Sequence, residues 1–436
     1  MNGAVKVIGA GLAGCEAAWQ LAENGISAEL FEMKPHKQTP AHISSDFAEL
    51  VCSNSLRSND LSNAAGLLKE EMRRLGSLII KTADETSIPA GGALAVDREQ
   101  FAKQITKKIT EHKKIKIISG EVTEIPEGKV IIATGPLTTE IFAEKITGLL
   151  PDKSMLSFFD AAAPIVTYES IETKNAFFAS RYDKGQADYI NCPLDKDEYT
   201  AFYNALIKAE CANVHGFEEK LVFEGCIPIE VMAKRGPDTI RFGPLKPVGL
   251  IDPKTGKEPY AVIQLRKDNK EGTLYNIVGF QTRLKFSEQN RIIGMIPALK
   301  NAEIVRYGIM HKNTYINSPK LLDRFYRLKE NKRISFAGQI TGVEGYVESA
   351  ASGLLCGIET ARSISGNKPL ELSGETAIGA LALYISSGSV SDFQPMNINF
   401  GIINQLDYKI KGKRYKNLAL SERSLKQIDT VKGNGH

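Results

Sequence analysis

The sequence has few residues of the kinds that build metal sites or disulfide frameworks. It contains six cysteines and six histidines among 436 residues, and no two cysteines form a C-x-x-C pair. The cysteines are scattered and do not gather with the histidines, which argues against zinc, a redox dithiol and a disulfide framework. We therefore predict no metal, and any cysteine that takes part in chemistry must act singly. The six positions are Cys15, Cys52, Cys192, Cys211, Cys226 and Cys356.

Long hydrophobic runs and internal repeats are also missing. No apolar stretch reaches the roughly 20 residues that a membrane-spanning helix needs. The first apolar strand begins at Val5, too early for a signal peptide to precede it. These observations predict a soluble cytoplasmic protein without a membrane partner, and 436 residues are enough for two or three domains.

An excess of one charge occurs only near the C-terminal end. The whole chain carries a formal charge of +4, and residues 407–436 contain eight Lys or Arg against three Asp or Glu. This tail therefore carries +5 and the remainder −1. The tail is either a solvated terminus or an electrostatic arm for a polyanion such as RNA. In the second interpretation Lys411 and Arg414 contact phosphates, and Tyr408 and Tyr415 stack on bases.

The first 32 residues carry the pattern of a dinucleotide-binding unit. A G-x-G-x-x-G run lies between an apolar strand and a helix-like segment, 15–23. Gly9 allows the tight turn, Gly11 admits backbone N–H groups to a pyrophosphate, and Gly14 lets the helix pack on the strand. Glu32 ends the next apolar run, where it can accept hydrogen bonds from a ribose. The predicted contacts in the turn are Gly9, Ala10, Gly11, Leu12, Ala13 and Gly14.

A second glycine-rich junction lies late in the chain. Residues 129–135 and 333–339 read as buried parallel strands, and a small-residue helix over 347–363 follows the second. The N-terminus of that helix can face an anion or a polarised ring carbonyl. Two such junctions suit a long cofactor lying across the sheet, so FAD is preferred over NAD. Further predicted contacts are Thr134, Gly135, Gly338, Gln339, Gly345 and Tyr346.

The order of these patterns predicts an α/β protein with an insertion. A Rossmann-like FAD-binding domain of the glutathione-reductase type is expected over 1–158 and 322–436. Residues 159–321 contain alternating apolar runs and two helical patterns, which are typical of an inserted α+β domain for substrate or RNA. Residues 34–63 lack regular periodicity but are apolar enough to form an ordered functional loop.

The chain contains distinctive strings at 50–57, 223–230, 241–250, 306–311, 313–316, 337–346 and 393–401. These strings resemble the folate- and FAD-dependent tRNA uracil-5-methyltransferases, the TrmFO family, and the likeness covers almost the whole chain. The broader GidA/MnmG flavoproteins, which modify wobble uridines, resemble the two FAD segments. They carry an additional C-terminal helical region that a chain ending at His436 lacks.

The resemblance implies reductive methylation of uridine C5 in the T-loop of tRNA, at uridine 54. It implies 5,10-methylenetetrahydrofolate as carbon donor, FAD as redox cofactor and NAD(P)H as the source of electrons. Cys226 is the implied nucleophile on uracil C6, and Cys52 is the implied second thiol, a base or a guard of the flavin-bound carbon. The residues alone leave the pKa of Cys226 open, since Glu224 would raise it and Lys234 would lower it.

Basic residues outside the glycine motifs are further candidates. Arg57 contacts flavin or folate, or forms an ordinary salt bridge. Arg98 is a weaker candidate of the same kind, and His311 is either structural or catalytic. Alternative functions are the same chemistry on a ribosomal RNA uridine, a non-methylating flavin oxidoreductase and an RNA-binding flavoprotein. Oligomeric state and the choice of NADH or NADPH stay open. The inserted segment offers Lys234, Arg235, Arg241 and Lys246 to RNA phosphates or the folate tail.

Overall fold

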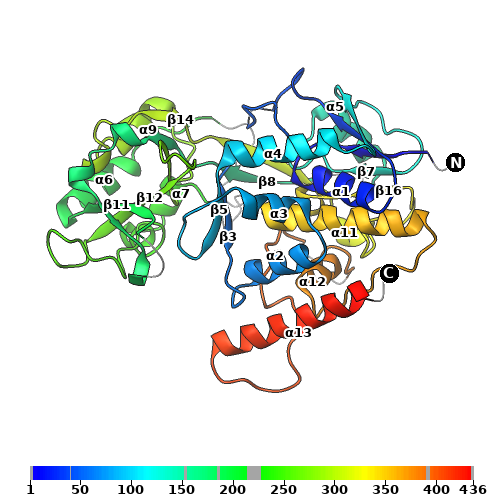
Figure 1. Ribbon diagram of the computed structural model, residues 1–436. Helices are drawn as coiled ribbons and strands as arrows, with labels where there is room; N and C mark the ends of the chain where they lie inside the picture. The colour runs from blue at the N-terminus through cyan, green and yellow to red at the C-terminus, as the bar shows by residue number, and fades with distance from the viewer. Residues whose placement is uncertain are drawn as a thin grey trace.

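A five-stranded parallel sheet forms the centre of the larger of two lobes (Figure 1). The structure is a computed structural model that describes residues 3–39, 41–151, 155–183, 187–213, 227–388 and 393–433. The strand order is β16-β7-β1-β2-β6, with every neighbouring pair parallel, which confirms the predicted α/β class. The strands are β1 (Val5–Ile8), β2 (Ala28–Glu32), β6 (Ile115–Ser119), β7 (Val130–Ile132) and β16 (Ile334–Phe336).

The strand order opens a crevice beside β1. After β2 and β6 the chain returns to the other side of β1, where β7 and β16 pair. Ligands of such sheets bind outside the carboxyl ends of the strands at the point where the order reverses. That point is bordered by the turn at Gly9 and by Ala133, whose N–H donates to the carbonyl of Ile8 at 2.9 Å. Both glycine-rich segments therefore end at the same edge of the sheet.

Two helices that begin at this edge pack against each other through small residues. They are α1 (Leu12–Glu23) and α11 (Tyr346–Ile364), which lie side by side in Figure 1. A Cβ on Gly353 would lie 2.2 Å from the carbonyl oxygen of Ala13, and a Cβ on Gly14 would lie 1.8 Å from that of Gly9. A side chain at Gly353 would push the two helices apart, and one at Gly14 would push α1 away from the Gly9 turn.

The segment between the crevice and β6 holds more structure than the periodicity predicts. The expected helices at 65–76 and 97–112 are present, and Asp97 caps the second by accepting from the N–H of Gln100 at 2.9 Å. A further helix and a three-stranded antiparallel sheet, β3-β5-β4, were not predicted. The elements of this segment are β3 (Ser55–Ser58), α2 (Ala64–Arg74), α3 (Leu78–Glu85), β4 (Ser87–Ile88), β5 (Ala93–Val96) and α4 (Arg98–Glu111). A further helix, α5 (Glu140–Gly148), follows β7.

Most of the basic C-terminal segment forms a docked helix and is not a solvated terminus, while its contact with RNA stays a prediction. This helix, α13 (Lys413–Gly433), runs beneath α2 and α12 (Ala377–Tyr384) in Figure 1. The Ser421 hydroxyl donates to the carbonyl of Leu61 at 2.7 Å, and the Arg74 guanidinium pairs with Asp429 at 2.5 Å. No helix in the described ranges is both long and apolar enough to cross a membrane.

The smaller lobe is built on a six-stranded antiparallel sheet, β10-β11-β12-β13-β9-β14. A two-stranded ribbon, β8 (Leu156–Ala161) with β15 (Met310–Tyr315), joins it to the larger lobe. The predicted domain boundaries at 158 and 321 stay predictions. The elements are β9 (Ile165–Thr167), β10 (Phe177–Ala179), β11 (Tyr189–Leu194), α6 (Lys196–Leu206), α7 (Ile229–Ala233), α8 (Pro237–Phe242), β12 (Ala261–Lys267), β13 (Leu274–Ile277), α9 (Phe286–Ile293), β14 (Ile304–Arg306) and the linking helix α10 (Ser318–Leu321).

Candidate active site

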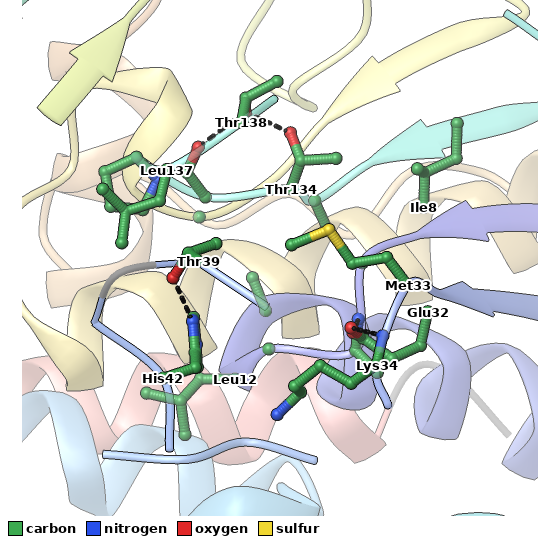
Figure 2. A pocket seen from close by; sticks show the side chains of 18 of the residues that line it. Ile8, Leu12, Glu32, Met33, Lys34, Thr39, His42, Thr134, Leu137 and Thr138 are labelled. Carbon is green, nitrogen blue, oxygen red and sulfur yellow. Dashed lines mark hydrogen bonds between the residues drawn. The ribbon is translucent and has the colours of Figure 1, made fainter. Parts of the chain in front are cut away.

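A pocket of about 1170 Å³, including its opening to solvent, lies at the carboxyl edge of the parallel sheet (Figure 2). Its walls come from the β1–α1 turn, the end of β2, the segment after β7 and the start of α11. Gly14, Arg57 and Gly345 are predicted contacts that do not line it. The predicted residues that do line it are Gly9, Ala10, Gly11, Leu12, Ala13, Glu32, Thr134, Gly135, Gly338, Gln339 and Tyr346.

The glycines of the first turn have separate roles. Gly9 has a φ of 98°, a conformation that favours glycine, and passes close to the backbone of Ala133. Gly14 is needed for packing, as its contact with the Gly9 carbonyl requires. Gly11, by contrast, lines the pocket with an ordinary φ of −74°, and a Cβ there would meet no protein atom within 4 Å. The space beside Gly11 therefore belongs to the pocket.

Glu32 lies on the pocket wall and braces the turn (Figure 2). Its Oε2 accepts from the N–H of Ala10 at 2.8 Å, and its Oε1 accepts from the N–H of Lys34 at 3.0 Å. A carboxylate has about four acceptor positions, so these two bonds leave capacity for a hydroxyl of a ligand.

The pocket also has a wall that the two glycine-rich motifs do not predict. It comes from residues 34–51, the first part of the aperiodic segment, where Thr39 and His42 bond side chain to side chain at 2.6 Å (Figure 2). The Thr134 and Thr138 hydroxyls lie 2.6 Å apart on the opposite side. The only signal in the sequence was a long, partly apolar loop, which predicts function but no particular residues. The lining residues of this loop are Lys34, Thr39, His42, Ala48, Glu49 and Val51.

Cys52 stands directly behind the pocket wall. Its neighbour Val51 lines the pocket, and its backbone N–H donates to the Tyr346 hydroxyl at 2.6 Å. The N–H of Ser53 donates to the same hydroxyl at 3.3 Å, while the Cys52 Sγ lies 3.9 Å from the carbonyl oxygen of Ala161. Tyr346 therefore fixes the Cys52 loop against the start of α11.

The surroundings of Cys52 keep its thiol protonated. Burial is the main cause of a raised pKa of about 12, and the charges of Asp160 and Glu344 act in the same direction. Arg98 and Arg306 lower the pKa but do not compensate. At neutral pH Cys52 is a neutral thiol, able to donate a proton or fill space.

A buried acid lies between Cys52 and α11. Burial raises the pKa of Glu344, and Asp160 and Glu348 raise it further, against the lowering effects of Arg57 and of the hydrogen bond from Gln339. Gln339 Nε2 donates to Glu344 Oε1 at 2.8 Å, whereas Oε2 has no hydrogen-bond partner among the described residues. Gln339 lines the pocket, so its side chain connects Glu344 to the pocket by this hydrogen bond.

Arg57 and Arg98 take part in ion pairs. Arg57 has a φ of 63° and pairs with the buried carboxylate of Glu348. Lys69 Nζ donates to the carbonyls on either side of Arg57, at 2.8 and 2.7 Å, which holds this backbone conformation. Arg98 pairs with Asp268 of the smaller lobe at 2.8 Å. For Arg57 the structure therefore shows the salt bridge that the sequence left open.

The candidate RNA contacts are dispersed over two surfaces. Arg241 stacks on Tyr260, 4.0 Å from the ring centroid, and donates to its carbonyl at 2.9 Å. Arg414 pairs with Asp60 at 3.1 Å. The others are Lys234, Arg235 and Lys411, which are exposed, and Lys246, which is half-buried.

Of the remaining cysteines, three are fully buried, Cys211 is half-buried and Cys226 is not described. Cys15, Cys192 and Cys356 are fully buried, and burial raises the pKa of each thiol. They are packing residues in this structure. Cys226 lies outside the described residues, as does Glu224. His311 lies on β15, paired in register with Asp160 of β8.

Known relatives match the chain over nearly its full length. The family model described as Glucose inhibited division protein A matches residues 4–368. The methylenetetrahydrofolate–tRNA-(uracil-5-)-methyltransferase TrmFO of Acetivibrio thermocellus is 59% identical over 423 residues, 97% of each chain. The enzyme of the same name from Bacillus licheniformis is 57% identical over 431 residues, 99% of each chain.

The solved structures extend the similarity to the fold. Aquifex aeolicus GidA in its form II crystal superposes with a TM-score of 0.71 at 17% identity, covering 99% of this chain and 73% of that chain. This similarity shows a shared fold, including the parallel sheet and the inserted lobe. With the sequence identities above, it confirms the resemblance noted in the motifs. The chain belongs to the TrmFO family of methylenetetrahydrofolate–tRNA-(uracil-5-)-methyltransferases.

Proposed function

We propose that this protein methylates C5 of a uridine in the T-loop of tRNA, uridine 54, using 5,10-methylenetetrahydrofolate as carbon donor. FAD in the sheet-edge pocket and NAD(P)H as reductant complete the proposal. The observation that carries it is identity of 57–59% to curated enzymes of that name over 97–99% of this chain. Such identity over full length supports a common reaction more strongly than the shared fold does.

The pocket fits FAD on three counts. The open space at Gly11 and the N-terminus of α1 suit a pyrophosphate, because backbone N–H groups there face the pocket. Glu32 has acceptor capacity for a ribose. The lining continues to Gly338 and Tyr346 at the second junction, which suits the far end of a long cofactor. FAD bound there supplies the two electrons that convert carbon at the formaldehyde level into a methyl group.

Two cysteines divide the uracil chemistry in this proposal. The Cys226 thiolate adds to C6, which makes C5 nucleophilic toward the one-carbon unit. A base then removes the C5 proton while the one-carbon unit leaves its carrier, which gives an exocyclic methylene group on C5. A hydride from reduced flavin would complete the methyl group as the C6–S bond breaks, which restores the ring double bond and the Cys226 thiolate. The neutral state of the Cys52 thiol supports its role as guard of the reacting carbon, since a thiol must lose its proton before it acts as a base.

RNA must be held while its target base leaves the stack. Turning out one base costs a few kcal/mol, and contacts to phosphates offset that cost. The exposed Lys234 and Arg235 on the smaller lobe and Lys411 beside α13 are the proposed phosphate contacts.

The proposal is tested by labelled one-carbon transfer to unmodified tRNA, with ribosomal RNA in parallel. One reaction contains methylenetetrahydrofolate with NADH or NADPH, and the other contains S-adenosylmethionine. Label should enter tRNA only in the first, and the purified protein should be yellow. A colourless protein, transfer from S-adenosylmethionine alone or label in ribosomal RNA alone would refute it.

The assigned nucleophile is tested by replacing Cys226 with Ala. The variant should keep FAD and lose turnover by at least about a thousandfold, because no other group forms the bond to C6. Cys211→Ala is the matched control. Cys211 is half-buried, forms a backbone β-bridge with Leu284, and has no assigned role in the reaction. Wild-type turnover in Cys226→Ala would show that another group attacks C6.

A further inference from the structure

An arginine of the smaller lobe contacts the two residues that follow Cys52. Arg266 lies on β12 and is 7% exposed. Its Nη2 donates to the Ser53 hydroxyl at 2.8 Å, and its Nε donates to Asn54 Oδ1 at 3.1 Å. The Asn54 amide in turn donates to the carbonyl of Lys267 at 2.8 Å. Three hydrogen bonds thus join β12 to the Cys52 loop across the lobe junction.

Arg266 is buried, although arginine side chains are mostly exposed in folded proteins. Burial acts to lower its pKa, and its hydrogen-bond partners Ser53, Asn54 and Tyr189 are all neutral side chains. An arginine stays protonated at neutral pH, so the positive charge is buried. Burying such a charge is unfavourable unless hydrogen bonds compensate, and here two of the hydrogen bonds go to the Cys52 loop.

The same loop is fixed from its other side by the larger lobe. The Tyr346 hydroxyl accepts from the N–H groups of Cys52 and Ser53 at 2.6 and 3.3 Å. Upstream, Arg98 donates to the carbonyl of Leu50 while paired with Asp268, which lies two residues after Arg266. The loop therefore bridges a pocket-lining tyrosine and the sheet of the smaller lobe.

We infer that Arg266 is a positioning residue, which places the Cys52 loop against Tyr346 and couples its geometry to the docking of the smaller lobe. The catalytic consequence rests on the proposed function, since it requires Cys52 to act at the pocket. In that case the contacts of β12 with Ser53 and Asn54 hold Cys52 in its position at the pocket. Lysine cannot replace this function fully, because a single ammonium lacks the planar fork that reaches Ser53 and Asn54 together.

The test is the rate at which Cys52 is alkylated in the purified holoenzyme without tRNA or folate, read by mass spectrometry of its peptide. Arg266→Gln should raise that rate about tenfold or more, the change expected when a charged hydrogen bond is lost. The kcat of Arg266→Gln for methylation should fall, while its KM for tRNA should stay near that of the wild type. The labelling rate of Arg266→Lys should lie between those of the wild type and Arg266→Gln.

Arg181→Gln is the matched control. Arg181 is also a partly buried arginine of the smaller lobe, but it donates to Gln264 at 3.1 Å and to the carbonyl of Val248 at 2.8 Å, both in its own lobe. Its substitution should leave Cys52 labelling unchanged. Equal acceleration in Arg181→Gln would indicate general loosening and overturn the inference.

Ser53→Ala keeps the test decisive if Arg266→Gln fails to fold. This substitution removes one contact without touching the arginine and should accelerate labelling in the same direction. Wild-type labelling in both Ser53→Ala and Arg266→Lys overturns the inference. An inactive wild-type enzyme would refute the proposed function and leave this comparison intact, since labelling needs no substrate.

Discussion

Two glycines of one motif illustrate how a residue type serves different physical needs. A Cβ on Gly14 would meet the Gly9 carbonyl at 1.8 Å, so its hydrogen side chain is a packing requirement. A Cβ on Gly11 would meet no protein atom within 4 Å, so protein packing alone permits alanine there. The requirement for glycine at position 11 must come from the ligand that approaches it.

Gly11→Ala and Gly14→Ala should therefore separate binding from folding. Gly11→Ala should leave the free energy of unfolding of the cofactor-free protein within about 0.5 kcal/mol of wild type and reduce bound flavin strongly. Gly14→Ala should lower both the free energy of unfolding and the amount of bound flavin, with a loss of stability of roughly 1–3 kcal/mol from overpacking. Urea unfolding and flavin absorbance per chain provide the measurements. Full flavin content in Gly11→Ala would contradict the assigned position of the pyrophosphate.

Residue-scale prediction from the sequence succeeded where a motif fixes the geometry locally. Residues 9–13 and Glu32 are close in the chain, and their placement at one pocket follows from strand, turn and helix, whereas Gly14 packs behind the turn. Arg57 was undecided because its partner Glu348 is 291 positions away. No local pattern reports such a contact, and the same holds for Tyr346 beneath Cys52.

At the scale of elements, α13 shows why a helix can be hidden in a sequence. The face it turns to α2 includes Asn417, Ser421 and Ser424 along with Leu420 and Ile428, all buried. Polar residues on a buried face weaken the apolar stripe that normally indicates an amphipathic helix. The composition therefore indicated only the positive charge of the exposed face, and the packing of this helix on α2 was not predicted.

Glu71 is the side chain that fastens α12 and α13 to α2. It accepts from the N–H groups of Ala377 and Ile378 at 2.6 and 2.9 Å, and from the Ser424 hydroxyl at 2.5 Å. Glu71→Gln should destabilise the protein by about 1–3 kcal/mol, because a neutral amide cannot accept all these bonds. Limited proteolysis should then release the C-terminal helix first. The neighbouring Glu70→Gln is the control and should have a much smaller effect, because Glu70 is half-buried and, among the described residues, pairs only with Arg73 and Arg74 of its own helix.

The pH dependence of this contact has a definite sign. Burial raises the pKa of Glu71 from 4.5 to about 7. Between these values the folded state holds a proton that the unfolded state releases, so the contribution of this group to stability is complete below pH 4.5 and is lost as pH rises through about 7. The stability advantage of wild type over Glu71→Gln should therefore shrink from about pH 5 to about pH 8. An advantage that grows over this range would contradict the buried, proton-binding state.

At the scale of the whole molecule, the sequence predicted two units but not how they meet. The glycine junctions and alternating runs indicated a nucleotide lobe and an insertion, and the structure contains both sheets. The contacts between lobes join residues far apart, such as Arg98 with Asp268 and Arg266 with Asn54, 170 and 212 positions away. Pairings of this kind depend on tertiary placement, which single-sequence patterns do not encode.

The basic surface near α13 should act on RNA through charge. Lys411→Ala should weaken tRNA binding and reduce the slope of log affinity against log salt by about 0.7–0.9, the value for one lost phosphate contact. Arg414→Ala should have a smaller effect, because Asp60 already pairs with that guanidinium at 3.1 Å. Melting temperature should stay unchanged in Lys411→Ala. Equal slopes in wild type and Lys411→Ala would remove this surface from the RNA interface.

The most direct measurement of the central claim follows the hydrogens of the new methyl group. Unmodified tRNA is incubated with the holoenzyme, NAD(P)H and methylenetetrahydrofolate deuterated at its methylene carbon, and the T-loop fragment is analysed by mass spectrometry. The account predicts a methyl group on uridine C5 that keeps both deuterium atoms and gains a third hydrogen from reduction. An unlabelled methyl group, or a T-loop fragment of unchanged mass, would contradict it.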